Sequence, residues 1–248
     1  DLLRWTSVPP PATLRSELAK CTQLWLISNS SCTLSAEHLQ IIKEFYQKGN
    51  GVAVWGDNAP YIADANALLP VLVPGLSMDG NVMGDKTISL RDPEAATAPG
   101  FRQHLITTGI QSLYEGVTIA TITLPPNDGQ GSGSYQNRVQ PLINGSAGNL
   151  VTAIVDSKER LLIDGGFTRL FCKWDTAGSA RYVKNVACWL DNRERRERER
   201  AERRERERAA EKGRRSGPSD KERGRRKRSS SSSSSRSPSR ERGRKARR

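Results

Sequence analysis

The sequence predicts an α/β domain, a sandwich of helices around a largely parallel sheet with an antiparallel edge. Residues 23–28 and 51–55 are short, continuously apolar runs, which are typical of strands buried on both faces. An amphipathic helix pattern lies between them, so the two runs and the helix form a βαβ unit. Further strand and helix patterns alternate toward residue 190, and this alternation favours the same fold class.

The helix between the two strands has well-marked ends. Ser35 is placed to cap its N-terminus, and Leu34 and Leu39 are spaced as a hydrophobic staple. Gly49 follows the last turn, where glycine commonly takes a left-handed conformation. The crossover between the strands is expected to be right-handed.

The later elements are shorter. Residues 63–72 predict a helix interrupted by Pro70, and residues 87–90 predict a short strand. Residues 117–124 are rich in β-formers, but their apolar phase slips at Ala120, as a bulge would cause. The remaining predictions are a long loop over 125–149, a hairpin of 150–155 and 160–164, and a last helix over about 180–190.

Charge divides the chain into a near-neutral part and a basic tail. Residues 191–248 hold 25 of the 40 Lys and Arg and 11 of the 27 Asp and Glu, whereas residues 1–190 are close to neutral. The tail has no Val, Ile, Leu, Met, Phe, Tyr, Trp or Cys, so it cannot form a core. We therefore divide the chain into an N-terminal extension (1–22), an α/β domain (23–190), a charged helix (191–212) and a disordered basic Arg/Ser-rich tail (213–248).

Several classes of protein do not fit the composition. The best apolar run, residues 67–73, is too short to span a bilayer and contains Pro70. The four cysteines have no CxxC spacing, which favours reduced thiols and an intracellular protein. With His38 and His104 the only histidines, no zinc spacing exists, and we expect neither a metal nor a cofactor.

Two loops should lie beyond the carboxyl ends of the strands, where α/β sheets bind ligands. The first loop could bind a polar ligand, or its Asp and Asn side chains could simply form turns and cap the next helix. The second contains a Gly-Gly pair that permits close backbone approach and arginines that could bind a carboxylate or phosphate, or it could be a Gly turn between strands with Arg181 paired to Asp175 or Asp57. The predicted ligand-binding residues are Trp55, Gly56, Asp57, Asn58, Tyr61, Asp64 and Asn66 in the first loop and Gly165, Gly166, Arg169, Asp175 and Arg181 in the second.

The order of LWLIS, helix, GVAVWGDN, HLITTGIQSLYEG and DGGFTRLF…ARYVKNVACWL resembles a class I glutamine-amidotransferase-like domain, nearer to its trehalose-utilisation-type branch. The resemblance covers about residues 20–190 and implies a flavodoxin-like three-layer fold with a crevice after GVAVW. Active members of the family carry a cysteine on the turn after that strand, assisted by a His and a Glu. This chain has Gly56, Asp57 and Asn58 there, so no nucleophile is present and a pseudoenzyme is predicted.

The tail carries its own signals. Residues 194–201 and 202–209 repeat the octapeptide ERRERERA, whose Glu–Arg pairs at i,i+4 favour a solvated helix. The segment from 213 resembles the Arg/Ser-rich tails of SR-type splicing proteins, which implies contact with RNA or acidic nuclear partners and control by phosphorylation. The predicted contact residues are Arg225, Arg226, Lys227, Arg228, Arg236 and Arg240.

Three functional hypotheses follow. The preferred one is a non-catalytic ligand- or protein-binding domain carried to the nucleus by its basic tail. The alternative is a hydrolase that uses Asp57, Asp64 and His104 in the crevice, and it requires these three side chains to converge. In a third, the chain is an RNA-processing factor whose domain is incidental, and the tail alone binds RNA.

Overall fold

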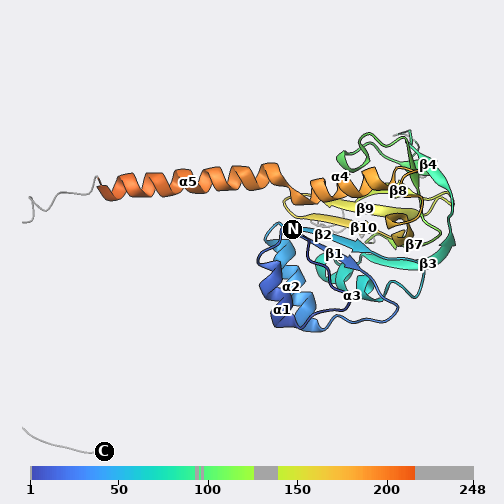
Figure 1. Cartoon of the computed structure of the whole chain (residues 1–248), viewed down its shortest axis with the longest axis horizontal. Coiled ribbons are helices and arrows are strands. Elements are labelled where there is room, and N and C mark those ends of the chain that lie inside the picture. Colours follow the sequence, from blue (N-terminus) through green and yellow to red (C-terminus); the bar gives the residue numbers. More distant parts are fainter. Residues whose placement is uncertain (1, 93–94, 96–97, 126–138, 216–248) are drawn as a thin grey trace, which may run out of the picture. The chain divides into compact units, whose positions relative to one another are not determined.

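The computed structural model describes residues 2–92, 95, 98–125 and 139–215. It separates into two compact units, 1–195 and 196–248. The first unit has a central six-stranded sheet in the order β1-β2-β10-β9-β8-β5 (Figure 1). Its strands are β1 (Gln23–Ile27), β2 (Gly51–Trp55), β5 (Gly100–Phe101), β8 (Val139–Asn144), β9 (Leu150–Asp156) and β10 (Arg160–Asp164).

The predicted α/β class is confirmed, but the predicted parallel character of the sheet is not. β1, β2 and β10 run parallel, and β9, β8 and β5 are each antiparallel to the strand before them in the sheet. The sheet is therefore mixed and mostly antiparallel. The difference arises because the hairpin of β9 and β10 lies inside the sheet and β8 forms within the segment predicted to be a loop.

The βαβ unit forms as predicted. α2 (Ala36–Gln47) connects β1 to β2, and the Ser35 hydroxyl accepts a hydrogen bond from the His38 N–H. Gly49 has a φ of +85° just after the helix, the conformation for which glycine is suited. All five residues of β2 are buried, whereas β1 is only partly covered because it lies at the sheet's edge.

Two hydrophobic clusters cover the two faces of the sheet. Val52 and Val54 of β2 face a cluster with α1 (Pro11–Leu18), α2 and α3 (Ala63–Leu72). Ala53 and Trp55 face the other cluster, with α4 (Ser179–Asp191) and the 3-10 turn η1 (Leu105–Thr107). This alternation follows from the two-residue repeat of a strand.

Two small antiparallel pairs complete the unit: β3 (Ser77–Met83) with β7 (Thr118–Thr123), and β4 (Thr87–Ser89) with β6 (Ser112–Tyr114). The predicted irregularity near Ala120 exists, but the additional residue lies in β3. Asp79 pairs with Thr121 and Val82 with Ile119, so three steps along β3 match two along β7. A bulge of this kind bends the strand that carries it and increases its local twist.

The last described helix is α5 (Arg193–Arg215), which follows a break at Asn192, where φ is +45°. Side chains from 197 to 211 are exposed. Arg203 Nε lies 3.5 Å from Glu207 Oε1, an i,i+4 pair with arginine first, the reverse of the order we predicted. The segment from 216, with every predicted RNA-contact residue, lies outside the described residues.

Candidate functional site

The bend that follows β2 is closely packed. The Gly56 N–H donates to the Asp164 carbonyl oxygen over 2.8 Å, and the Gly56 carbonyl accepts from the Phe167 N–H over 3.0 Å. A Cβ at position 56 would lie 2.4 Å from Met78 Sδ. A side chain that could act as a nucleophile therefore has no room at this position without displacement of Met78.

Asp57 and Asn58 are engaged in the loop itself. Asp57 Oδ1 accepts from the Asn58 N–H at 2.9 Å, and burial raises the pKa of this carboxyl group. Asn58 Oδ1 accepts from the Thr118 hydroxyl at 2.8 Å, which ties the bend to β7. Tyr61 is half exposed after this turn. These contacts agree with the alternative in which the Asp and Asn side chains of this loop form turns.

Asp64 is a buried anchor for the loop between β1 and α2. Its exposed fraction is 2%, and its carboxylate accepts from the N–H groups of Asn29, Thr33 and Leu34 and from the Thr33 hydroxyl, at 2.7–3.2 Å. Asn66 acts similarly toward β3, because its amide makes hydrogen bonds with both the N–H and the carbonyl of Met78. Both side chains therefore hold neighbouring backbone segments in position.

A fully buried polar network lies beside the bend, at the carboxyl end of β10. Asp164 accepts from the Tyr182 hydroxyl at 2.7 Å, the Thr152 hydroxyl at 2.9 Å and the Gly166 N–H at 2.8 Å. Arg169 Nη2 lies 3.4 Å from Asp164 Oδ1, and its guanidinium stacks over the Tyr182 ring. Arg169 and Asp164 have no exposed side-chain surface, so this pair holds the DGGFTR turn in place.

The Gly-Gly pair permits the close approach that the sequence predicted. A Cβ at Gly165 would lie 2.4 Å from the Ala120 carbonyl oxygen, and one at Gly166 would lie 2.5 Å from the Glu115 carbonyl oxygen. The neighbour is backbone in both cases. The glycines therefore let the chain pack against β7 and the end of β6.

Glu115 is the buried carboxylate that the sequence analysis missed. It is fully buried after β6, and its oxygens accept from the Lys86 N–H, the Ser146 N–H and the Ser146 hydroxyl. It therefore joins three segments that are far apart in the chain. The only local signal is an acidic residue between Tyr114 and Gly116, which does not separate it from a surface glutamate.

His104 does not meet Asp57 or Asp64. Its Nε2 lies 3.5 Å from Asp156 Oδ2, and Asp156 pairs in the sheet with Arg160, which in turn pairs with Gly51 at the start of β2. The five residues of β2 span about 13 Å from the first Cα to the last. Asp57 follows the far end of this strand, away from His104. The convergence that the hydrolase hypothesis requires is therefore not present.

The remaining predicted groups are also dispersed. Arg181 Nε donates to the Thr108 carbonyl at 3.4 Å, and Asp175 lies on the surface. Cys32 is exposed, with Sγ 3.5 Å from the Leu34 carbonyl oxygen, and the His38 ring bonds to Ser35 and to the Pro9 carbonyl. Among the described residues, no group of three His, Cys, Asp or Glu side chains could hold a metal ion.

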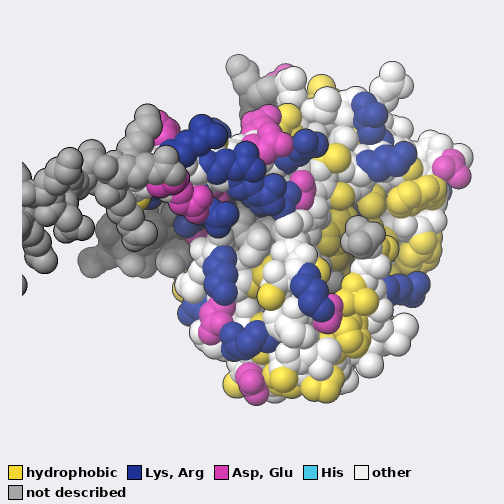
Figure 2. Space-filling model, turned by 60° about the vertical axis from the view of Figure 1, so that its left-hand side comes forward, with side chains coloured by type: hydrophobic (Ala, Val, Ile, Leu, Met, Phe, Trp, Pro, Cys, Tyr) yellow, Lys and Arg dark blue, Asp and Glu magenta, His cyan; other side chains and the backbone are white. Residues whose placement is uncertain are grey.

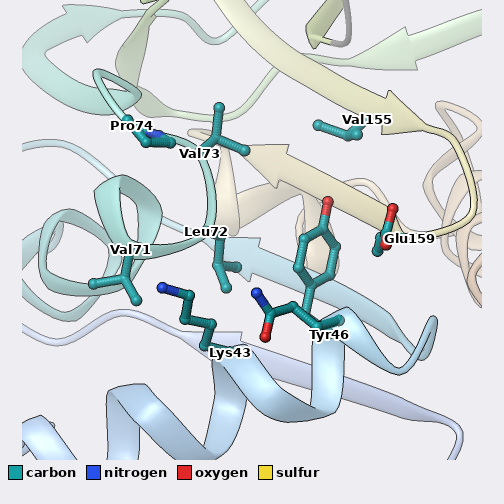
Figure 3. A pocket seen from close by; sticks show the side chains of 9 residues that line it. Lys43, Tyr46, Val71, Leu72, Val73, Pro74, Val155 and Glu159 are labelled. Atoms are coloured by element: carbon teal, nitrogen blue, oxygen red, sulfur yellow. The ribbon is translucent and has the colours of Figure 1, made fainter. Parts of the chain in front are cut away.

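A hollow of about 210 Å³ opens elsewhere, between α2, the end of α3 and the β9–β10 turn. Figure 3 shows Lys43 and Glu159 on opposite sides of Tyr46, with Val73, Pro74 and Val155 above them in this view. Its volume is below the range of about 300–1,000 Å³ that is usual for drug-sized ligands. The lining residues are Lys43, Tyr46, Gln47, Val71, Leu72, Val73, Pro74, Val155 and Glu159.

On the face shown in Figure 2, Lys and Arg side chains lie beside Asp and Glu side chains. In contrast, residues 193–215 of α5 contain twelve basic and seven acidic residues. Within the described part of the chain, no helix has the length and apolar composition needed to cross a bilayer. No protein-family model, curated protein or solved structure matches the chain.

Proposed function

We propose that residues 23–190 form a non-catalytic binding domain of the amidotransferase-like type and that residues 191–248 bind RNA. The observation that carries the first half is the bend after β2. Position 56 is a glycine with no nucleophilic group, a larger side chain there would have to displace Met78, and Asp64 is engaged by four hydrogen-bond donors. The flavodoxin-like plan is proposed for the three parallel strands and the helices packed on them.

The second half rests on charge. The exposed part of α5 presents arginines along its length, and the residues after it add a further net positive charge. Such a segment attracts phosphates without reading bases, because the tail has no aromatic side chain to stack on them. A basic tract of the kind at 225–228 also directs proteins to the nucleus, and nuclear location is part of this proposal.

Titration of the full chain with a single-stranded RNA at several salt concentrations tests the second half. The logarithm of the affinity should fall linearly with the logarithm of salt concentration, with a slope of roughly −0.7 per phosphate contacted. A chain ending at Arg195, which retains both hydrophobic clusters, is the matched control and should lose the binding. Retained binding by this control, or a flat salt response, would contradict the proposal. Tighter binding of polyglutamate than of RNA at equal charge would favour an acidic protein as the partner instead.

We propose that the ligand of the domain binds at the hollow rather than at the bend, because the Asp and Asn side chains of the bend already take part in hydrogen bonds within the protein. Lys43 can hold a carboxylate while Val71, Leu72 and Val155 contact an apolar body. Calorimetric titration with hexanoate should give binding that hexanol does not match and that Lys43→Met abolishes. Equal binding of the acid and the alcohol would refute this placement.

A further inference from the structure

β1 leaves one edge of the central sheet open. In its parallel pairing with β2, the Gly51 N–H donates to the Thr22 carbonyl and the Ser28 N–H donates to the Trp55 carbonyl. Because a strand's backbone groups alternate in direction, residues 22, 24, 26 and 28 pair with β2, and Gln23, Trp25 and Ile27 direct theirs outward. Among the described residues, no backbone hydrogen bond is formed by these three outward-directed residues.

This edge lacks the devices that usually protect an exposed strand. Residues 21–36 contain no charged side chain, and β1 has no proline and no bulge. The opposite edge differs, because β5 has two residues and the Arg91 N–H already donates to the Phe101 carbonyl. Ile27 is 50% exposed, and Trp25 is held in place by stacking on Trp55 at 5.7 Å.

We propose that β1 pairs antiparallel with β1 of a second copy of this chain, so that the two sheets become continuous. Gln23-Leu24-Trp25-Leu26-Ile27 is self-complementary about Trp25. The outward-directed residues then form the pairs Trp25 with Trp25 and Gln23 with Ile27, with about six hydrogen bonds in total. Leu24 lies opposite Leu26 on the other face. None of these pairs brings like charges together, and residues 1–190, which carry this edge, are close to neutral.

A second copy fits this edge better than an unrelated peptide does. In the two-fold arrangement, the backbone groups of Gln23, Trp25 and Ile27 in one copy pair with those of the same three residues in the other copy. An isologous interface requires this symmetry. It also covers Leu24 and Leu26, which pack only partly buried against the core, with their own counterparts.

Sedimentation of the full chain over a wide concentration series tests the proposal. The native chain should reversibly form a dimer, and Ile27→Lys should weaken the dimer at least about tenfold, because a charge on an edge strand opposes pairing. Leu105→Lys, at a position 65% exposed on η1, is the matched control and should dimerise like the native chain. A native chain that is monomeric throughout, or an Ile27→Lys variant that still dimerises, would overturn the proposal.

Cross-linking tests the register independently of that variant. In a background of Cys32→Ser and Cys188→Ser, the double variant Gln23→Cys, Ile27→Cys should form a disulfide-linked dimer. Paired residues in this register have Cα atoms about 5.5 Å apart, within disulfide range. Either cysteine alone should not cross-link to itself, and equal cross-linking of the single variants would contradict the register.

Discussion

Replacement of Asp64 by alanine should destabilise the fold severely. The carboxylate accepts from three backbone N–H groups and one hydroxyl, at a position 2% exposed. A hydrogen bond to a charged acceptor contributes about 1.5–3 kcal/mol, and a buried donor left unpaired costs a similar amount. Asn29 and Thr33 are exposed enough for water to replace the lost acceptor, but Leu34 is buried. The expected loss is therefore about 3–4 kcal/mol, a large share of a typical 5–15 kcal/mol.

Urea unfolding of the full chain measures this loss, followed by tryptophan fluorescence. Asp64→Asn is the matched variant. It keeps the volume and one acceptor but turns a donor toward an N–H group, so it should lose about half as much. A catalytic carboxylate would behave in the opposite way, because its removal relieves buried charge and leaves stability unchanged or higher. A loss below about 1 kcal/mol for Asp64→Ala would refute the anchoring role.

Substitutions at three other residues test the same structural roles. Asp57→Asn should leave the free energy of unfolding at pH 7 unchanged or slightly higher. Burial raises the pKa of Asp57, so its ionised form is unfavourable in the folded protein. A clear loss of stability in urea unfolding would contradict this. Glu115→Ala should cost about 2–4 kcal/mol, and Glu115→Gln less, since the amide keeps one of the two acceptors; calorimetric melting of both variants gives the comparison. Burial lowers the pKa of His104, so the unfolded chain binds the proton more readily and stability falls as pH drops below about 6.5. His104→Gln should make that acid-induced fall shallower, and identical pH profiles for the two proteins would count against the effect.

The local part of the fold could be predicted because its signals are local. The apolar run of β2, the Ser35 cap and Gly49 each specify structure within a few residues, and each is confirmed. The β9–β10 hairpin was also predicted, from a turn between two apolar runs. What could not be predicted was where the hairpin would lie. Its insertion between β2 and β8 depends on long-range pairing, for which a single sequence gives no pattern.

In the candidate site, too, local features could be predicted from the sequence and long-range contacts could not. For the first loop, the sequence left ligand binding and turn formation both open, and the hydrogen bonds of Asp57, Asn58, Asp64 and Asn66 agree with the second interpretation, because Asp and Asn have known local roles. The buried network of Asp164, Arg169 and Tyr182 was not predicted, since its members come from β10, η3 (Phe167–Leu170) and α4 and meet only in three dimensions. Glu115 was not predicted for the same reason, because its partners Lys86 and Ser146 are distant in the sequence.

The most direct test of the account is covalent labelling of the full chain with a diazoketone analogue of glutamine, read by intact mass and peptide mapping. We expect no saturable adduct on residues 55–66, because Asp64 is occupied by hydrogen-bond donors and position 56 has no side chain to react. A stoichiometric adduct on Asp57, Asp64 or one of the cysteines Cys32 and Cys172 that free glutamine prevents would reveal a reactive centre and contradict the proposal that the domain is non-catalytic.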